Sequence, residues 1–102
     1  MVEIYRQVGL HRARKEVVAL ATVVGASGST PSKLGAKMLV LPDGGTVGTV
    51  GGGCAEAEVW QVAHEVVRTG APRLIAIDLT GENAEEEGMV CGGRMELFVE
   101  PL

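Results

Sequence analysis

The sequence predicts a single α/β or α+β domain with a mixed β-sheet of about five strands, one strong helix and one weaker helix. Three patterns favour this fold class. The run VVALATVV at 17–24 is short, continuous and rich in β-branched residues, which is typical of a strand buried on both faces. Apolar residues at three-and-four spacing after Cys54 predict an amphipathic helix. In RMELFVE at 94–100, Met95, Leu97 and Val99 alternate with Glu96, Phe98 and Glu100, which predicts a strand with unlike faces.

The first half of the chain predicts a helix, three strands and the loops between them. Residues 3–14 have an amphipathic pattern that a central glycine weakens, so we expect a marginal helix there. The strand at 17–24 is followed by the loop GASGSTPSKLG at 25–35. Two further strands are expected at 36–41 and 46–50. They are joined by the turn Pro-Asp-Gly-Gly, so this pair must be antiparallel.

The second half is dominated by the helix that follows Cys54. Its predicted buried face consists of Ala55, Val59, Val62, Ala63 and Val66. Gly70 and Pro72 are expected to end it. A strand at 73–79, a polar connection at 80–88 and the alternating strand complete the chain. We expect a mixed sheet, in which the first hairpin supplies the antiparallel part.

Composition and charge exclude several classes of protein. The 102 residues fit one domain, and the net charge of −4 comes from interspersed acids and bases rather than a clustered basic face. Nucleic-acid binding is therefore not expected. The N-terminus lacks a secretory signal, and the longest apolar run is too short to span a membrane. We expect a cytoplasmic protein whose two cysteines are free, reactive or ligating rather than paired in a structural disulfide.

The clearest candidate site is the stretch GTVGGGCAEAE at 48–58, where three glycines precede a cysteine and a helix. First-turn amides are unpaired and carry the positive end of the helix dipole, and glycines let a ligand approach the backbone. This arrangement favours an anion or phosphate, although it is neither a Walker motif nor a dinucleotide fingerprint. The same dipole favours the Cys54 thiolate. The candidate residues are Gly51, Gly52, Gly53, Cys54 and Glu56.

A second glycine–cysteine element, VCGGR at 90–94, stands just before the last strand. A zinc site takes four N or S ligands with paired spacing, and neither His11 nor His64 has that spacing from a cysteine, so we do not favour zinc. A third candidate is the loop SGSTPSKLGAK, whose hydroxyls and cations suit an oxyanion. These two elements supply Cys91, Gly92, Gly93 and Arg94, and Ser29, Thr30, Lys33 and Lys37.

The motifs GSTP, GAKM, GGGC-x-E and CGG occur in this order between Val17 and Leu102. With the stretches around them, they resemble the XdhC/CoxI family. Its members are accessory proteins of molybdenum hydroxylases such as xanthine dehydrogenase and carbon monoxide dehydrogenase. The resemblance implies a maturation factor that binds molybdenum cofactor as cargo, assists its sulfuration and delivers it to the apoenzyme. A sulfurtransferase is a further possible partner.

By motif position, the resemblance implies cofactor contacts from Ser29, Thr30, Gly51, Gly52, Gly53, Cys54, Glu56, Cys91, Gly92 and Gly93. Lys33, Lys37 and Arg94 join them as cations that suit a phosphate. The thiols of Cys54 and Cys91 would contact the soft metal, molybdenum.

The sequence departs from the family pattern in two places. Members often have a basic residue directly after STP, whereas this chain has Ser32 followed by Lys33. Longer members continue into a Rossmann-like domain, whereas we expect one domain over residues 1–102. Such a chain would need a partner or self-association to complete a pocket, so we expect a homo-oligomer such as a dimer.

Three function classes stay open at this point. The first is a non-catalytic or weakly catalytic cofactor carrier. The second is a thiol enzyme for sulfur transfer with Cys54 as nucleophile, although no histidine is placed by motif as its base. The third is an interaction module, which an apolar patch without a pocket near the glycines would favour. Simple structural roles also compete: both cysteines as buried apolar residues, and Glu56 as a carboxylate favoured by the helix dipole.

Overall fold

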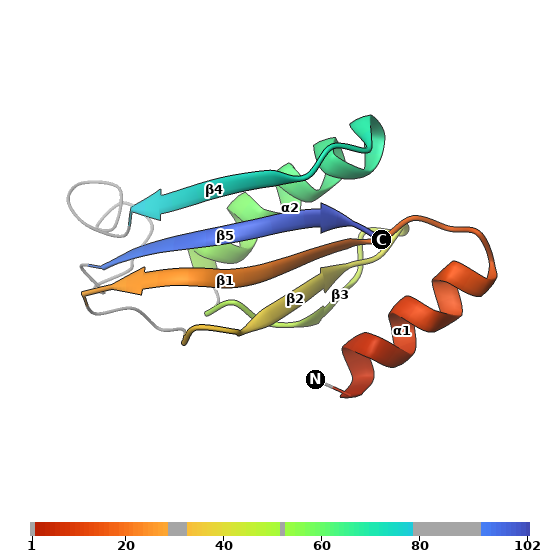
Figure 1. Cartoon of the computed structure of the whole chain (residues 1–102), viewed down its shortest axis with the longest axis horizontal. Helices are drawn as coiled ribbons and strands as arrows, with labels where there is room; N and C mark the ends of the chain where they lie inside the picture. Colours follow the sequence, from red (N-terminus) through yellow and green to blue (C-terminus); the bar gives the residue numbers. More distant parts are fainter. Residues whose placement is uncertain (1, 29–32, 52, 79–92) are drawn as a thin grey trace.

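The computed structural model describes residues 2–28, 33–51, 53–78 and 93–102, with the backbone alone for Cys54. The two helices are α1 (Val2–Ala13) and α2 (Gly53–Thr69). The strands are β1 (Ala19–Ser27), β2 (Lys37–Val40), β3 (Thr46–Gly48), β4 (Arg73–Asp78) and β5 (Arg94–Pro101). They form one sheet in the order β3-β2-β1-β5-β4 (Figure 1). The predicted class of helices with a five-stranded sheet is confirmed for the described residues.

All four strand pairs in the sheet are antiparallel, so the sheet is not mixed as we expected. The reason lies in where α2 leads the chain. It connects β3, at one edge of the sheet, to β4, at the other edge, and therefore creates no parallel pair of neighbours. β5 then returns between β4 and β1 and runs antiparallel to both.

The main core lies between α2 and one face of the sheet. The predicted helix face is confirmed, because all five of its residues are buried. The alternation predicted for β5 is also confirmed: Met95, Leu97 and Val99 are fully buried in this core, whereas Glu96 is exposed. This burial of apolar side chains on both layers is the dominant favourable contribution to folding.

A smaller core lies on the opposite face of the sheet, beneath α1. Ile4 is buried there with Val18, Leu20 and Leu39. The first half of β1 is thus covered from both sides, as predicted for the run at 17–24, whereas Val17 precedes the strand and Val24 is exposed. β1 extends further than predicted, to Ser27, because it continues to pair with β5 beyond an irregularity between residues 23 and 25.

Local signals explain how the elements begin and end. The hairpin turn between β2 and β3 is closed by the Leu41 amide, which donates to the Gly45 carbonyl at 2.8 Å. The helix α2 ends where predicted, with the Gly70 amide donating to the Val66 carbonyl. The connection expected at 80–88 lies outside the described residues. In the described part of the chain, neither helix is long and apolar enough to cross a membrane.

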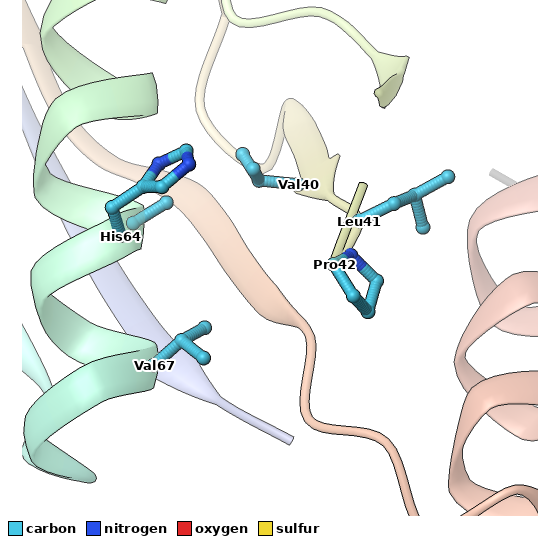
Figure 2. Close-up of a pocket in the computed structure, with 6 residues that line it drawn as sticks. Val40, Leu41, Pro42, His64 and Val67 are labelled. Carbon is cyan, nitrogen blue, oxygen red and sulfur yellow. The ribbon is translucent and has the colours of Figure 1, made fainter. Parts of the chain in front are cut away.

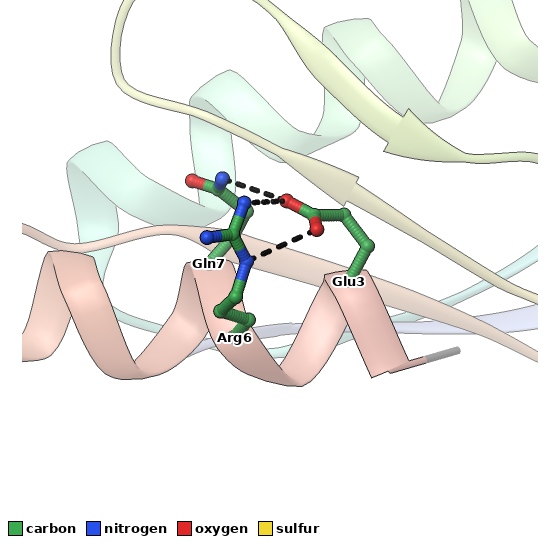
Figure 3. Close-up of polar contacts among 3 residues, drawn as sticks. All are labelled: Glu3, Arg6 and Gln7. Atoms are coloured by element: carbon green, nitrogen blue, oxygen red, sulfur yellow. Dashed lines mark hydrogen bonds and ion pairs between the residues drawn. The ribbon is translucent and has the colours of Figure 1, made fainter.

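The surface of α1 is held by a cluster of three polar side chains (Figure 3). The Glu3 carboxylate accepts hydrogen bonds from Arg6 at 3.0 and 3.1 Å and from Gln7 at 2.9 Å. These residues are three and four positions apart, so they face each other on the helix surface. The cluster supports the first turns of a helix whose sequence is only weakly amphipathic.

From the position of the main core, we expect alanine substitutions of two leucines on neighbouring strands to lower the free energy of unfolding by different amounts. Leu97 on β5 has no exposed surface, whereas Leu74 on β4 is 62% exposed. Leu97→Ala should lower the free energy of unfolding by about 2–5 kcal/mol, because it removes buried methyl groups and leaves a cavity. The control Leu74→Ala should change it by about 0.5 kcal/mol or less. Urea denaturation measures both, and equal effects would contradict the two-sided description of the sheet.

The polar cluster on α1 leads us to expect that the pKa of Glu3 depends on Arg6. Hydrogen bonds from Arg6 and Gln7 hold the pKa of the Glu3 carboxyl below its ordinary value. The ionised Glu3 carboxylate therefore stabilises the folded protein fully at pH values above the pKa of about 4.3 that it has in the unfolded chain. This stabilisation is lost as the pH falls through the lower pKa that Glu3 has in the folded protein. Arg6→Gln should raise the pKa of Glu3 in an NMR titration, whereas Arg12→Gln should not. An unchanged Glu3 titration in Arg6→Gln would show that the cluster does not form.

Candidate functional site

The topology brings the predicted loops to one end of the sheet. β1, β3 and β4 end at Ser27, Gly48 and Asp78, and β2 and β5 begin at Lys37 and Arg94. Arg94 is the register partner of both Ser27 and Asp78. The ends of β1 and β4 and the start of β5 lie together at the left of Figure 1. Motifs that are far apart in the sequence therefore lie next to the same end of the sheet.

We call the passage from β3 to α2, residues 48–53, the glycine loop, because its described glycines adopt backbone conformations that favour glycine. Gly48, Gly51 and Gly53 have φ values of 82°, 121° and 56°, which other residues rarely adopt. Gly48 also lacks room for a side chain. An added Cβ would lie 2.5 Å from the Lys37 carbonyl oxygen and 2.9 Å from Ile4 Cδ1. At Gly48 the glycine therefore serves close packing.

Thr49, a residue that the sequence analysis did not predict, connects the glycine loop to the first turn of α2. The Thr49 hydroxyl donates to the Glu56 carboxylate and accepts a hydrogen bond from the Gly51 amide at 3.0 Å. Glu56 is thus tied to the loop from the first turn of α2. The signal for Thr49 was its position two residues before a loop glycine, where threonine commonly bonds to a nearby backbone amide.

The structure places the other predicted residues unevenly. Lys33 and Arg94 are exposed, and Gly93 is buried. Lys37 is half-buried, and its ammonium donates to the Thr22 hydroxyl at 3.4 Å, on the sheet face opposite α2. Lys37 is therefore not on the side of the sheet from which the glycine loop enters α2. The predictions for Ser29, Thr30, Gly52, Cys91, Gly92 and the Cys54 side chain lie outside the described residues.

The two histidines have protein partners of their own. His11 Nδ1 lies 2.9 Å from Glu16 Oε1, and His64 Nδ1 lies 2.8 Å from the Trp60 carbonyl oxygen. They belong to α1 and α2, which pack against opposite faces of the sheet. Among the described residues, no group of three or more histidines, cysteines or acids is placed to hold a metal ion.

Two hollows lie at the end of the sheet away from the glycine loop. The smaller, about 70 Å³, opens between the β2–β3 turn and α2 (Figure 2) and is lined by Val40, Leu41, Pro42, Ala63, His64 and Val67. Trp60 fixes that turn to the helix, because its indole N–H donates to the Gly44 carbonyl at 3.0 Å. The larger hollow, about 420 Å³, lies beside the end of α1. Neither is lined by a residue of the glycine loop.

Comparisons with known proteins place this arrangement in a family. The XdhC and CoxI family model matches residues 11–78. The chain is 38% identical over 81 residues to the uncharacterized protein YqeB of Escherichia coli (strain K12), a match that covers 79% of this chain and 15% of the relative. It is 35% identical over 78 residues to a probable xanthine dehydrogenase subunit of Bacillus subtilis (strain 168), a match that covers 76% of this chain and 24% of that protein.

A solved structure supports the fold. The crystal structure of a xanthine dehydrogenase from Bacillus halodurans matches with a TM-score of 0.75 and 27% identity, over 94% of this chain and 29% of that chain. The chain therefore spans less than a third of the length of each of these three proteins.

The glycine loop predicts opposite effects of alanine at two glycines. Gly48→Ala should destabilise the protein by about 1–3 kcal/mol or more, because it adds backbone strain and a steric clash with Lys37. Gly9→Ala, inside α1 with nothing within 4 Å of an added Cβ, should stabilise it by about 0.5–1 kcal/mol. Thermal and urea unfolding test both. A stable Gly48→Ala variant would refute the packing described for this residue.

Proposed function

The chain belongs to the XdhC and CoxI family, and we propose that it is an accessory protein that binds molybdenum cofactor and assists its sulfuration or insertion into a molybdenum hydroxylase. Two of the three similar proteins are named after xanthine dehydrogenase, which supports a hydroxylase of that type as the client. A hydroxylase of the carbon monoxide dehydrogenase type is the other client class. The cofactor is cargo here, so the protein must both hold it and release it.

The glycine loop is the observation that carries this proposal. It leads directly into α2, whose first-turn amides have no partners within the helix and whose dipole favours a negative charge. Gly53 is exposed, and neither it nor Gly51 has a side chain that would keep a ligand from the backbone. An anionic phosphate such as that of the cofactor suits this position.

Charged and thiol groups at the same end of the sheet would complete the site. Lys33 is exposed and precedes β2, which begins at this end of the sheet, whereas Arg94 starts β5 on the sheet face opposite α2, the same face as Lys37. The Lys33 ammonium would bind a phosphate through charge-assisted hydrogen bonds, which are stronger than neutral ones. Cys54 is the second residue of α2, where the dipole favours its thiolate, and a thiolate is a suitable ligand for a soft metal. Cys91 would act as the second thiol.

The positions of the histidines favour a carrier over a thiol enzyme. His64 follows Cys54 by ten residues on α2, which corresponds to roughly 15 Å along the helix axis. His11 lies on α1, on the other side of the sheet. In the described part of the chain, neither is therefore placed as a general base for Cys54. Sulfur transfer by Cys54 stays the alternative, and homo-oligomer formation stays a prediction.

Anaerobic cofactor binding tests this function. Purified protein is mixed with molybdenum cofactor and separated by size, and bound molybdenum and pterin are assayed. The native protein should retain both, and Cys54→Ala and Cys91→Ala should retain less molybdenum. Lys33→Gln should weaken binding about 10- to 150-fold, since a hydrogen bond to a charged group is worth about 1.5–3 kcal/mol.

The matched control is Arg68→Gln, which removes an exposed cation from the last turn of α2, far from the glycine loop. It should bind as the native protein does. If the native protein retains no cofactor, or if all four variants behave alike, the proposed site is wrong. Retention of pterin without any effect of either cysteine would leave the phosphate site standing and reject the thiol contacts.

A further inference from the structure

The chain leaves α1 through a turn that carries three cations, Arg12, Arg14 and Lys15, which we call the basic turn. Two backbone hydrogen bonds close it: the Lys15 amide donates to the Arg12 carbonyl at 3.0 Å, and the Glu16 amide donates to the His11 carbonyl at 2.9 Å. Lys15 has a φ of 59°, in the region that glycine usually occupies at the end of a helix. A lysine in this conformation is strained, so its cation is held here at a cost in backbone stability.

The basic turn forms one wall of the larger hollow. Arg12 and Lys15 line this hollow of about 420 Å³ together with Glu16, Val17, Pro101 and Leu102. The apolar part of the lining is accessible: Val17 is 44% exposed, and Pro101 and Leu102 are only half-buried. The hollow therefore offers an apolar surface beside cations.

The charges of the basic turn are not neutralised within the described part of the chain. Arg12, Arg14 and Lys15 form no ion pair there. The one side-chain carboxylate among the lining residues, that of Glu16, lies 2.9 Å from the His11 ring. Residues 12–16 contain three arginines or lysines and one glutamate, a net charge of +2 in a chain whose total is −4. Such a local positive patch attracts and orients an acidic partner.

We propose that this hollow docks an acidic segment of a partner protein. Carboxylates of the segment would pair with the basic turn, and one apolar side chain would cover Val17, Pro101 and Leu102. A small inorganic anion fits less well, because it would leave the apolar lining of Val17, Pro101 and Leu102 uncovered. The hollow lies at the opposite end of the sheet from the glycine loop, so this docking goes beyond the proposed cofactor binding and does not depend on it.

The test uses the whole chain and a labelled glutamate-rich peptide with one central leucine, followed by fluorescence anisotropy at low salt. We expect saturable binding that weakens as salt is added. Combining Arg12→Glu with Lys15→Glu should weaken binding at least about tenfold, because attraction becomes repulsion. Arg68→Glu, which reverses an exposed charge on α2, should change it less than about twofold. A peptide with serine in place of leucine should bind more weakly.

A second variant separates binding from folding. Lys15→Gly suits the positive φ, so it should keep or raise stability while it weakens peptide binding. The proposal is overturned by absence of peptide binding or by equal losses in Arg68→Glu. Displacement by millimolar inorganic phosphate would overturn it in favour of a small-anion site, and self-association through the basic turn in favour of a second copy. Unchanged cofactor retention in Lys15→Gly would show that the two sites are independent.

Discussion

The packing of α2 against the sheet is the interaction on which the rest of the structure depends. Buried residues of the helix, such as Val59 and Val66, meet Leu97 and its neighbours across the main core. This contact fixes where α2 begins, and the chain must reach that point from the end of β3 in a few residues. The left-handed glycines are the conformational solution to this short connection. The candidate site is thus a by-product of core packing and is supported by it.

The second, smaller core connects α1 to the same loop. Ile4 is buried beneath the sheet, and its Cδ1 lies close to the position that a Gly48 side chain would occupy. Because Ile4 belongs to α1, this helix restricts position 48 to glycine. Position 48 begins the loop that leads to α2 on the other face of the sheet. Because packed interiors leave little free volume, a change in the docking of α1 would be felt at this residue.

Patterns that depend on neighbours in sequence were predictable, and pairings between distant segments were not. The spacing on α2 and the alternation on β5 indicate the buried faces directly, since each follows from the geometry of one element. The return of β5 between β1 and β4 depends on contacts across the whole chain, so the antiparallel order could not be derived from any single motif. The hydrogen bond between Thr49 and Glu56 likewise joins the glycine loop to α2. The conformation of the basic turn became evident only from the observed backbone angle of Lys15.

The contact between Trp60 and the hairpin turn gives this protein an internal optical reporter. Trp60 is the single tryptophan of the sequence and is 41% exposed. Its indole donates a hydrogen bond to the Gly44 carbonyl, and its ring centroid lies 4.1 Å from that of His64. Its emission therefore depends on whether the hairpin rests on α2. That hairpin continues into the glycine loop. Detachment of the hairpin from α2 can therefore be followed by intrinsic tryptophan fluorescence, without any label.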